Sequence, residues 1–341
     1  MPDFISGPVL NPQDIPLLGS ITYGVTSGVI GAHAHTGALS LVLSLPPDGT
    51  TAFVAEADRL TGQAQAGHNT LTGTVNEAIG DAVTLSGHAQ GGGNSIMISG
   101  ALGPGIAIGD AYTLTGHAHG GDNTVSSLAR GGQAAVGDAV FMSGFAEGGH
   151  NHVSGSARIQ TFLYGDAEFM SQHATGGYNT LTGVETNPTV MFGDAFELSG
   201  HATGGHNTLI APSGLGPVGP SYNLMYGDGY ELLDHASGGG NTLVSGGSND
   251  MMYGDAAMVS PQATTAPNSF VFTPHNANDQ IMDFRQGSDH IELRGFGFSS
   301  FSQLAADISS TAHGELITFG ANDTILVVGV NQLRADDFVF T

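Results

Sequence analysis

An acidic residue recurs eight times along the chain, and an asparagine follows each copy thirteen residues later. The acids are Glu56, Asp81, Asp110, Asp138, Asp166, Asp194, Asp228 and Asp255. Carboxylates at a regular spacing can bind divalent cations, transfer protons, or accept hydrogen bonds from nearby backbone N–H groups. Which chemistry applies depends on how the copies lie relative to one another.

The residues around each acid recur with it. Alanine lies eight residues after every acid, and apolar or aromatic residues lie two before, four after and fifteen after. The half from acid to asparagine has a fixed length, whereas the return to the next acid varies. Fixed positions that stack in register, with the variation confined to loops, are typical of solenoids. Glycine is too frequent for helices, and a 3.6-residue period is missing.

The repeat therefore predicts an all-β protein, a parallel β-solenoid or β-roll of about eight coils. At one strand spacing per coil the rod would be about 40 Å long. We expect an N-terminal cap over residues 1–50, coils over 51–270 and a β-rich C-terminal cap over 271–341. The stretch "AHAHTGALSL", residues 32–41, is a weaker echo of the repeat and suggests a decayed first copy.

In-register stacking would place the acids about 4.8 Å apart. Each neighbouring pair of charges would cost about 1 kcal/mol in water and roughly 3–4 kcal/mol at an effective dielectric near 20. The chain has no Lys to offset this cost, so either the side chains fan into solvent or a cation lies between them. Ca²⁺ suits carboxylate and carbonyl oxygens in Gly-rich turns. The column predicts calcium ligands at Asp81, Asp110, Asp138, Asp166, Asp194, Asp228 and Asp255. The alternative is that each acid caps its turn by accepting local N–H groups.

The overall charge narrows the partners. Thirty Asp and Glu face six Arg, giving a net charge of −24, so nucleic acid and anionic membrane surfaces are poor partners. No apolar run approaches the ~20 residues that span a bilayer. The first twenty residues lack the basic and long apolar regions of a Sec signal peptide.

Asparagine and histidine form two further columns. The asparagines are expected to be structural, because stacked amides can hydrogen-bond along the axis. Histidine often lies seven residues after the acid, and His-x-His pairs occur at His33/His35, His117/His119 and His150/His152. Such a pair supplies two of the ligands that Zn²⁺ or Cu²⁺ needs and falls short of a complete site. Solvated turn residues are the alternative.

Two stretches resemble a known family. Residues 238–256, "GGGNTLVSGGSNDMMYGDA", resemble the calcium-binding nonapeptide of repeats-in-toxin (hemolysin-type) proteins. The tail, "IMDFRQGSDHIELRGF" followed by "DDFVF", is similar to the C-terminal segment of that family. The resemblance implies a calcium-loaded β-roll, exported by type I secretion machinery without a cleaved N-terminal signal and folded outside the cell. It also directs attention to Asp250, Asp255, Asp279, Asp283 and Asp289 as ligands. The coils here are longer than the family's, and most corners read G-G-x-N.

These observations predict a secreted calcium-binding structural or interaction protein of an extracellular matrix, surface layer or adhesion system, able to self-assemble. A calcium-dependent carbohydrate-binding module that uses variable loops such as residues 210–222 is the alternative. A solenoid polysaccharide lyase or epimerase is third. An enzyme is not expected, because H-E-x-x-H and G-x-S-x-G are missing and few cations could neutralise a uronate.

Overall fold

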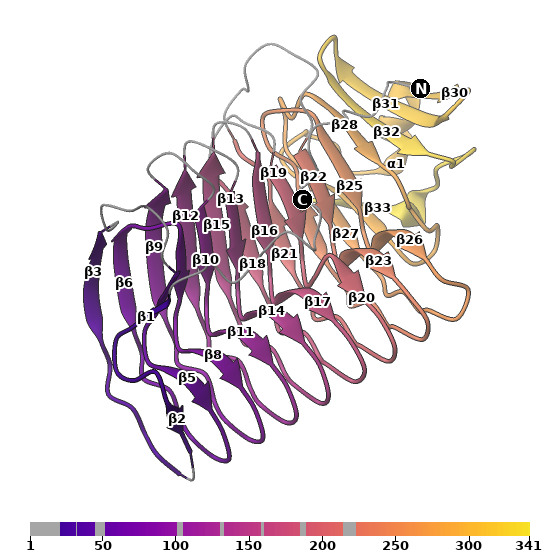
Figure 1. Cartoon of the computed structure of the whole chain (residues 1–341). Helices are drawn as coiled ribbons and strands as arrows, with labels where there is room; N and C mark the ends of the chain where they lie inside the picture. Colours follow the sequence, from indigo (N-terminus) through magenta and orange to yellow (C-terminus); the bar gives the residue numbers. More distant parts are fainter. Residues whose placement is uncertain are drawn as a thin grey trace.

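The chain folds as a parallel β-solenoid, as predicted. In the computed structural model each coil contributes one strand to each of three sheets, which run side by side along a rod (Figure 1). The structure describes residues 21–31, 33–44, 52–100, 105–129, 133–157, 160–184, 189–213 and 223–341. Among these residues, no helix is long and apolar enough to cross a bilayer.

Sheet 1 holds the strand that precedes each acid. In spatial order its thirteen strands are β1 (Ile21–Tyr23), β4 (Ala52–Val54), β7 (Glu77–Ile79), β10 (Gly105–Ile108), β13 (Gln133–Val136), β16 (Thr161–Tyr164), β19 (Thr189–Phe192), β22 (Asn223–Tyr226), β25 (Asp250–Tyr253), β28 (Asn278–Ile281), β32 (Asp323–Val328), β31 (Gly314–Gly320) and β30 (Ile308–Thr311).

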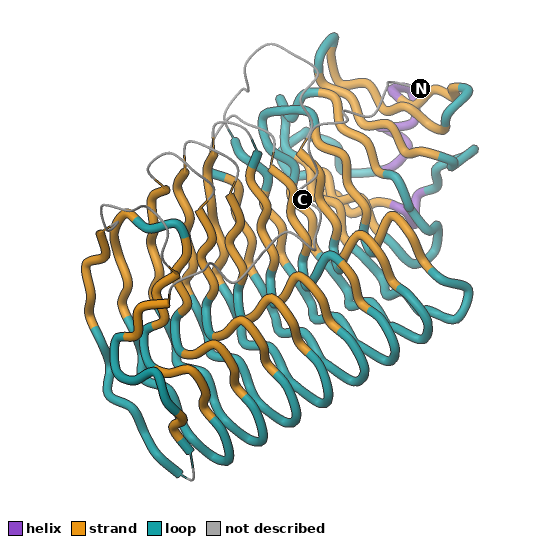
Figure 2. The backbone as a smooth tube through the Cα atoms, viewed as in Figure 1, coloured by secondary structure: helices purple, strands orange, loops and turns teal. Residues whose placement is uncertain are grey.

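Sheet 2 follows the acid. Its nine strands are β2 (Val29–Ile30), β5 (Ala57–Leu60), β8 (Ala82–Leu85), β11 (Ala111–Leu114), β14 (Ala139–Met142), β17 (Ala167–Met170), β20 (Glu197–Leu198), β23 (Gly229–Leu232) and β26 (Ala256–Val259). A turn then reverses the chain, and these turns align along one side of the rod (Figure 2).

Sheet 3 follows the asparagine. Its eleven strands are β3 (Ser40–Ser44), β6 (Thr70–Thr74), β9 (Ser95–Gly100), β12 (Thr124–Ala129), β15 (His152–Ala157), β18 (Thr180–Gly183), β21 (Thr208–Ile210), β24 (Thr242–Val244), β27 (Ser269–Phe272), β29 (His290–Leu293) and β33 (Phe338–Phe340). The connections back to sheet 1 contain the length variation of the repeat.

The strands pair so that each repeat position lies on the same position of the next coil. Ala107 pairs with Ala135 in sheet 1, and Val125 pairs with Val153 in sheet 3. Strands β1, β2 and β3 pair in the same way with β4, β5 and β6, so the weak echo at residues 32–41 belongs to a coil that precedes residue 51.

The parallel sheets also continue past residue 270. Strands β28 and β29 extend sheets 1 and 3, and β33 pairs with β29. The antiparallel strands β30, β31 and β32, with the short helices α1 (Phe301–Leu304), η2 (Ala305–Asp307) and η3 (Ala335–Asp337), complete this end.

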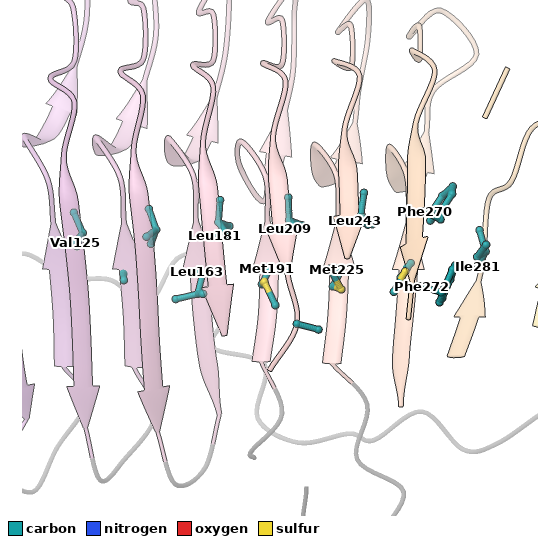
Figure 3. Packing of buried hydrophobic residues seen from close by; sticks show 14 of the residues in the cluster. Val125, Leu163, Leu181, Met191, Leu209, Met225, Leu243, Phe270, Phe272 and Ile281 are labelled. Carbon is teal, nitrogen blue, oxygen red and sulfur yellow. The ribbon is translucent and has the colours of Figure 1, made fainter. Parts of the chain in front are cut away.

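The main core lies between sheets 1 and 3. Position fifteen after the acid, from Leu71 to Phe270, meets the alternate residues of sheet 1, such as Leu163 and Met191 (Figure 3). Inside the turn, the alanine eight residues after the acid packs against the apolar residue at position four. Both positions were predicted as core.

The apolar residues two before the acid are buried as well, but they lie elsewhere. Strand residues alternate between faces, so Ile108 points away from the core that receives Ala107. These side chains form a separate cluster with Tyr112 and Phe196 of sheet 2 on the opposite face of sheet 1. Tyr164 and Tyr226 belong to it and are only 4% and 5% exposed, which supports the packing role expected for them.

Candidate functional sites

The acid column lies between sheets 1 and 2, where the chain bends. Each acid's N–H donates to the carbonyl of the next acid, as Asp138 does to Asp166 at 2.9 Å, so the acids stack at one coil spacing. The side chains do not fan into solvent. The column acids from Glu56 to Asp255 are 0–2% exposed.

Each carboxylate accepts a hydrogen bond from the backbone N–H eleven residues later. The distances are 2.7 Å for Gly121 to Asp110, 2.9 Å for Gly149 to Asp138 and 2.6 Å for Gly205 to Asp194. The acid thereby joins its own strand to the chain that returns from the turn. We call this junction, from the acid to the asparagine, the neck of the coil. These are the bonds that the turn-capping alternative requires.

The asparagine column completes the neck. The N–H of Asn123 donates to Asn151 Oδ1 at 3.0 Å, and the N–H of Asn151 donates to Asn179 Oδ1 at the same distance. Asn151 Nδ2 donates to the carbonyl of Gly165, also at 3.0 Å. The predicted ladder therefore exists, but it joins each amide to backbone groups of its neighbours and not to another amide.

Burial changes the titration of the acids. It raises the pKa of Asp138 and of Asp194 to about 6 and, together with the charge of Glu56, that of Asp81 to about 8. Burial and then the charges of both neighbours raise the pKa values of three further acids well above the usual range: Asp110, Asp166 and Asp228. Asp255, at the end of the column, has its pKa raised by burial to about 7.

The surroundings of the column do not fit calcium. Calcium takes six to eight oxygen ligands, whereas the groups that point at these carboxylates are N–H donors. Glycine backbone lies against successive acids: a Cβ on Gly204 would lie 2.6 Å from Asp194 Oδ2 and 2.7 Å from Asp228 Oδ1, so a larger residue would not fit beside them. Among the described residues, no three His, Asp or Glu side chains are grouped so that they could hold a metal ion.

Three of the C-terminal acids gather around an arginine. Arg285 forms ion pairs with Asp255 at 3.0 Å and with Asp289 at 3.2 Å. Asp283 accepts the N–H groups of Gly254 at 2.7 Å and Asp255 at 3.1 Å. The guanidinium already supplies the positive charge here, so these three acids are poor candidates for a further cation.

Asp250 and Asp279 form a different pair, at the junction of the last coil and the cap. They lie in register on β25 and β28, are 0% and 1% exposed, and form no ion pair with Arg in the described part of the chain. Burial raises the pKa of Asp250 to about 7, and burial with the charge of Asp250 raises that of Asp279 well above its usual range.

The carboxylates of this pair accept N–H groups of Asn223, Gly246, Asp250 and Asn276, and two neutral oxygens also lie beside them. Asn276 donates its amide to Asp279 Oδ2 at 2.5 Å, and its buried Oδ1 has no hydrogen-bond partner in the described part of the chain. The Ser245 hydroxyl also lies beside Asp279. His275 and Ala277, on either side of Asn276, have φ of 70° and 67°, a conformation that costs energy in residues other than glycine.

The histidine column is exposed, and its rings stack. His88, His117, Phe145, His173, His201 and His235 follow one another at centroid separations of 4.9–5.1 Å, with planes within 9° of parallel. His119 pairs with Glu147 at 3.0 Å, and His150 lies 3.7 Å from Asp122. The His-x-His pairs therefore do not converge on a third ligand within the described residues.

At the N-terminal end of this column is a polar hollow of about 340 Å³. It is lined by four histidines and three glutamines, among them His33, His88 and His119, at positions seven and nine of the repeat; the first coil, which contributes His33 and His35, has Thr26 at the position of the acid. Gln65 Nε2 donates to Gln90 Oε1 at 2.8 Å. In the next coil position nine is Glu147, and in later coils it is Thr or Ser; the residues that line the hollow come from the first four coils.

Sequence reasoning missed several buried acids, and Glu168 is one of them. It lies two positions after its column acid, where the other coils have apolar or aromatic residues except for Asp58, and it is 2% exposed. Burial raises its pKa to about 8. A charged residue in a mainly apolar column was the available signal.

Fold and neck together define a parallel β-solenoid repeat protein with paired columns of buried carboxyl and asparagine side chains. No protein-family model matches the chain, and no curated protein was found to be similar to it.

Proposed function

We propose that the chain is an elongated structural protein that works outside the cell and associates with further copies of itself through sheet 3. One observation carries this proposal: the nine strands of sheet 3 from β3 to β27 contain no Asp, Glu or Arg, in a chain of net charge −24. The resemblance of the tail to type I secretion segments supports export.

Two copies can approach through this face without bringing carboxylates together. Its strands carry Ser or Thr at most outward positions, with Val42, Met97 and Leu128 at 86%, 52% and 40% exposure. Nine strands at ~4.8 Å and about five residues at ~3.3 Å give roughly 700 Å² per copy. That area approaches the ~800 Å² that each partner contributes to a standard interface.

Charge placed on this face should abolish the association. We expect Thr180→Glu with Thr208→Glu to convert the assembled protein to monomer in light scattering, because the new carboxylates face those of the other copy. Thr175→Glu with Thr203→Glu is the matched control, in the same two coils but on the exposed turn, and should assemble normally. Assembly by both variants, or a monomeric parent protein, would contradict the proposal.

In this proposal, calcium binds at the junction between the last coil and the C-terminal cap. Asp250 and Asp279 would hold the ion through carboxylate oxygens, with Asn276 Oδ1 and the Ser245 hydroxyl as neutral ligands. The ion supplies the positive charge that these two buried acids lack. Because both acids must be ionised to bind it, binding should release protons and tighten as pH rises.

Calorimetric titration with Ca²⁺ at pH 8 tests this site. We expect Asp279→Asn to weaken binding by at least about tenfold, because a carboxylate ligand is lost. Asp122→Asn, which removes an exposed acid, should leave the affinity unchanged. Equal affinity in the two variants would rule out the junction as the site.

The polar hollow favours a second candidate function, carbohydrate binding. Imidazole and carboxamide groups can both donate and accept hydrogen bonds, which suits sugar hydroxyls. The variable loop proposed for this role at residues 210–222 lies largely outside the described residues. Retention of the monomer on a glycan column, lost in His88→Ala with His119→Ala but kept in His201→Ala with His235→Ala, would favour this reading.

A further inference from the structure

We propose that successive carboxyl groups of the acid column are joined by shared protons, with every second acid protonated in the folded protein at neutral pH. The inference concerns the column acids from Asp110 to Asp228 and is independent of the calcium junction and of self-association. It follows from the mismatch between the column and calcium.

The first step is that the column carries unbalanced charge. Its acids repeat at one coil spacing and are fully buried, where like charges repel strongly. Among the described residues, other charged side chains act on these acids only near the ends of the column. They are Glu56 beside Asp81, and Arg285, Asp283 and Asp289 beside Asp255. Between these ends the neck presents only backbone N–H groups and neutral Asn amides.

The second step is that N–H donors satisfy only part of the carboxyl oxygen capacity. Asp194 Oδ2 and Asp228 Oδ2 are buried and accept no hydrogen bond in the described structure. Asp194 Oδ2 and Asp228 Oδ1 face the same point beside Gly204. A proton on one acid would let its O–H donate to the other acid's carboxylate, which gives a short and strong bond.

The third step assigns the protons. Two close carboxyl groups that cannot both ionise share one proton. Asp138 is stabilised as a carboxylate by side-chain hydrogen bonds from both Asp110 and Asp166, and Asp194 likewise by Asp166 and Asp228. The protonated set is therefore Asp110, Asp166 and Asp228, and the ionised set is Asp138 and Asp194, which lie between them.

Substitution by Asn distinguishes the two sets. At a protonated acid, the neutral Asn amide keeps a hydrogen-bond donor in place of the O–H group. Asp166→Asn should keep the donor toward Asp194 and melt within a few degrees of the parent. Asp194→Asn replaces an acceptor by a donor that faces two O–H groups, and should melt at a clearly lower temperature. The two positions share burial, coil type and N–H contacts, so each is a control for the other.

Infrared spectroscopy reads the protons directly. At pH 7 the parent-minus-variant difference spectrum of Asp110→Asn, Asp166→Asn, Asp228→Asn should contain the C=O band of a carboxylic acid. If the triple variant does not fold, Asp166→Asn alone should remove about a third of that band. A difference spectrum with only carboxylate bands, or loss of the band on adding Ca²⁺, would overturn the proposal. Failure of calcium binding or of assembly would leave it intact.

Discussion

Replacing Asn151 by Ala is expected to destabilise the fold by about 2–6 kcal/mol. The change removes Oδ1, which accepts the N–H of Asn123, and Nδ2, which donates to the carbonyl of Gly165. Both backbone groups would then be buried without a partner, at about 1–3 kcal/mol each. Because the bonds join adjacent coils, the loss falls on the contact between repeats, which stabilises a solenoid. Chemical unfolding followed by circular dichroism measures it.

The neighbouring residue provides the control. His150 is exposed; its backbone N–H and its ring contact Asp122, and its ring also lies against that of the exposed Tyr178, so His150→Ala should change stability by only about 0.5 kcal/mol. A loss at Asn151 no larger than that at His150 would mean that water replaces the ladder and that the asparagine column is not structural.

The architecture was predictable because each core position repeats eight times. A single alanine has little meaning, but Ala64 and its seven counterparts at position eight can only be one inward column. Leu71 and its counterparts at position fifteen similarly predicted the core between sheets 1 and 3. The repeat did not reveal the face on which Ile108 and its counterparts lie, because that depends on the bend at the acid.

The chemistry of the acid column was harder to predict from the sequence. Spacing alone predicted that Asp138 and Asp166 stack, but it could not distinguish a corner that exposes their oxygens from a neck that surrounds them with N–H groups. The backbone conformation at Gly149 and Gly177 decides between these two arrangements. The sequence shows that these residues are glycines, but it does not show which way their N–H groups point. The sequence alone therefore left calcium along this column as a prediction.

At the C-terminal end, family resemblance directed attention to five acids as if they were equivalent. The structure divides them into two groups by their contacts with Arg285, which lies far along the sequence from Asp250 and Asp255. Arg285 pairs with Asp255 and Asp289, whereas Asp250 and Asp279 have no such partner in the described part of the chain. Asn276, the residue that makes the second pair fit a cation, belongs to no repeat. A pattern based on repeats could not have found it.

Stability should fall as pH rises from about 4 to about 9. The buried acids have pKa values above the 3.8 of an ordinary Asp, so the folded state binds more protons than the unfolded state between those values. Their contribution is complete below about pH 4. It is lost as pH rises through about 6 at Asp138 and Asp194 and about 8 at Asp81. A pKa of about 6 in place of 3.8 corresponds to roughly 3 kcal/mol for each of the first two groups.

Thermal melting between pH 5 and pH 9, with chelator present and at high salt, checks this prediction. Salt screens repulsion between exposed carboxylates and leaves buried pairs largely unscreened, so the decline should persist. Chelator removes any stabilisation by calcium at the junction, which would otherwise oppose the decline at high pH. A melting temperature that stays level across this range would mean that the column ionises without cost. In that event a counter-charge must reach Asp138 and Asp194 from outside the described residues.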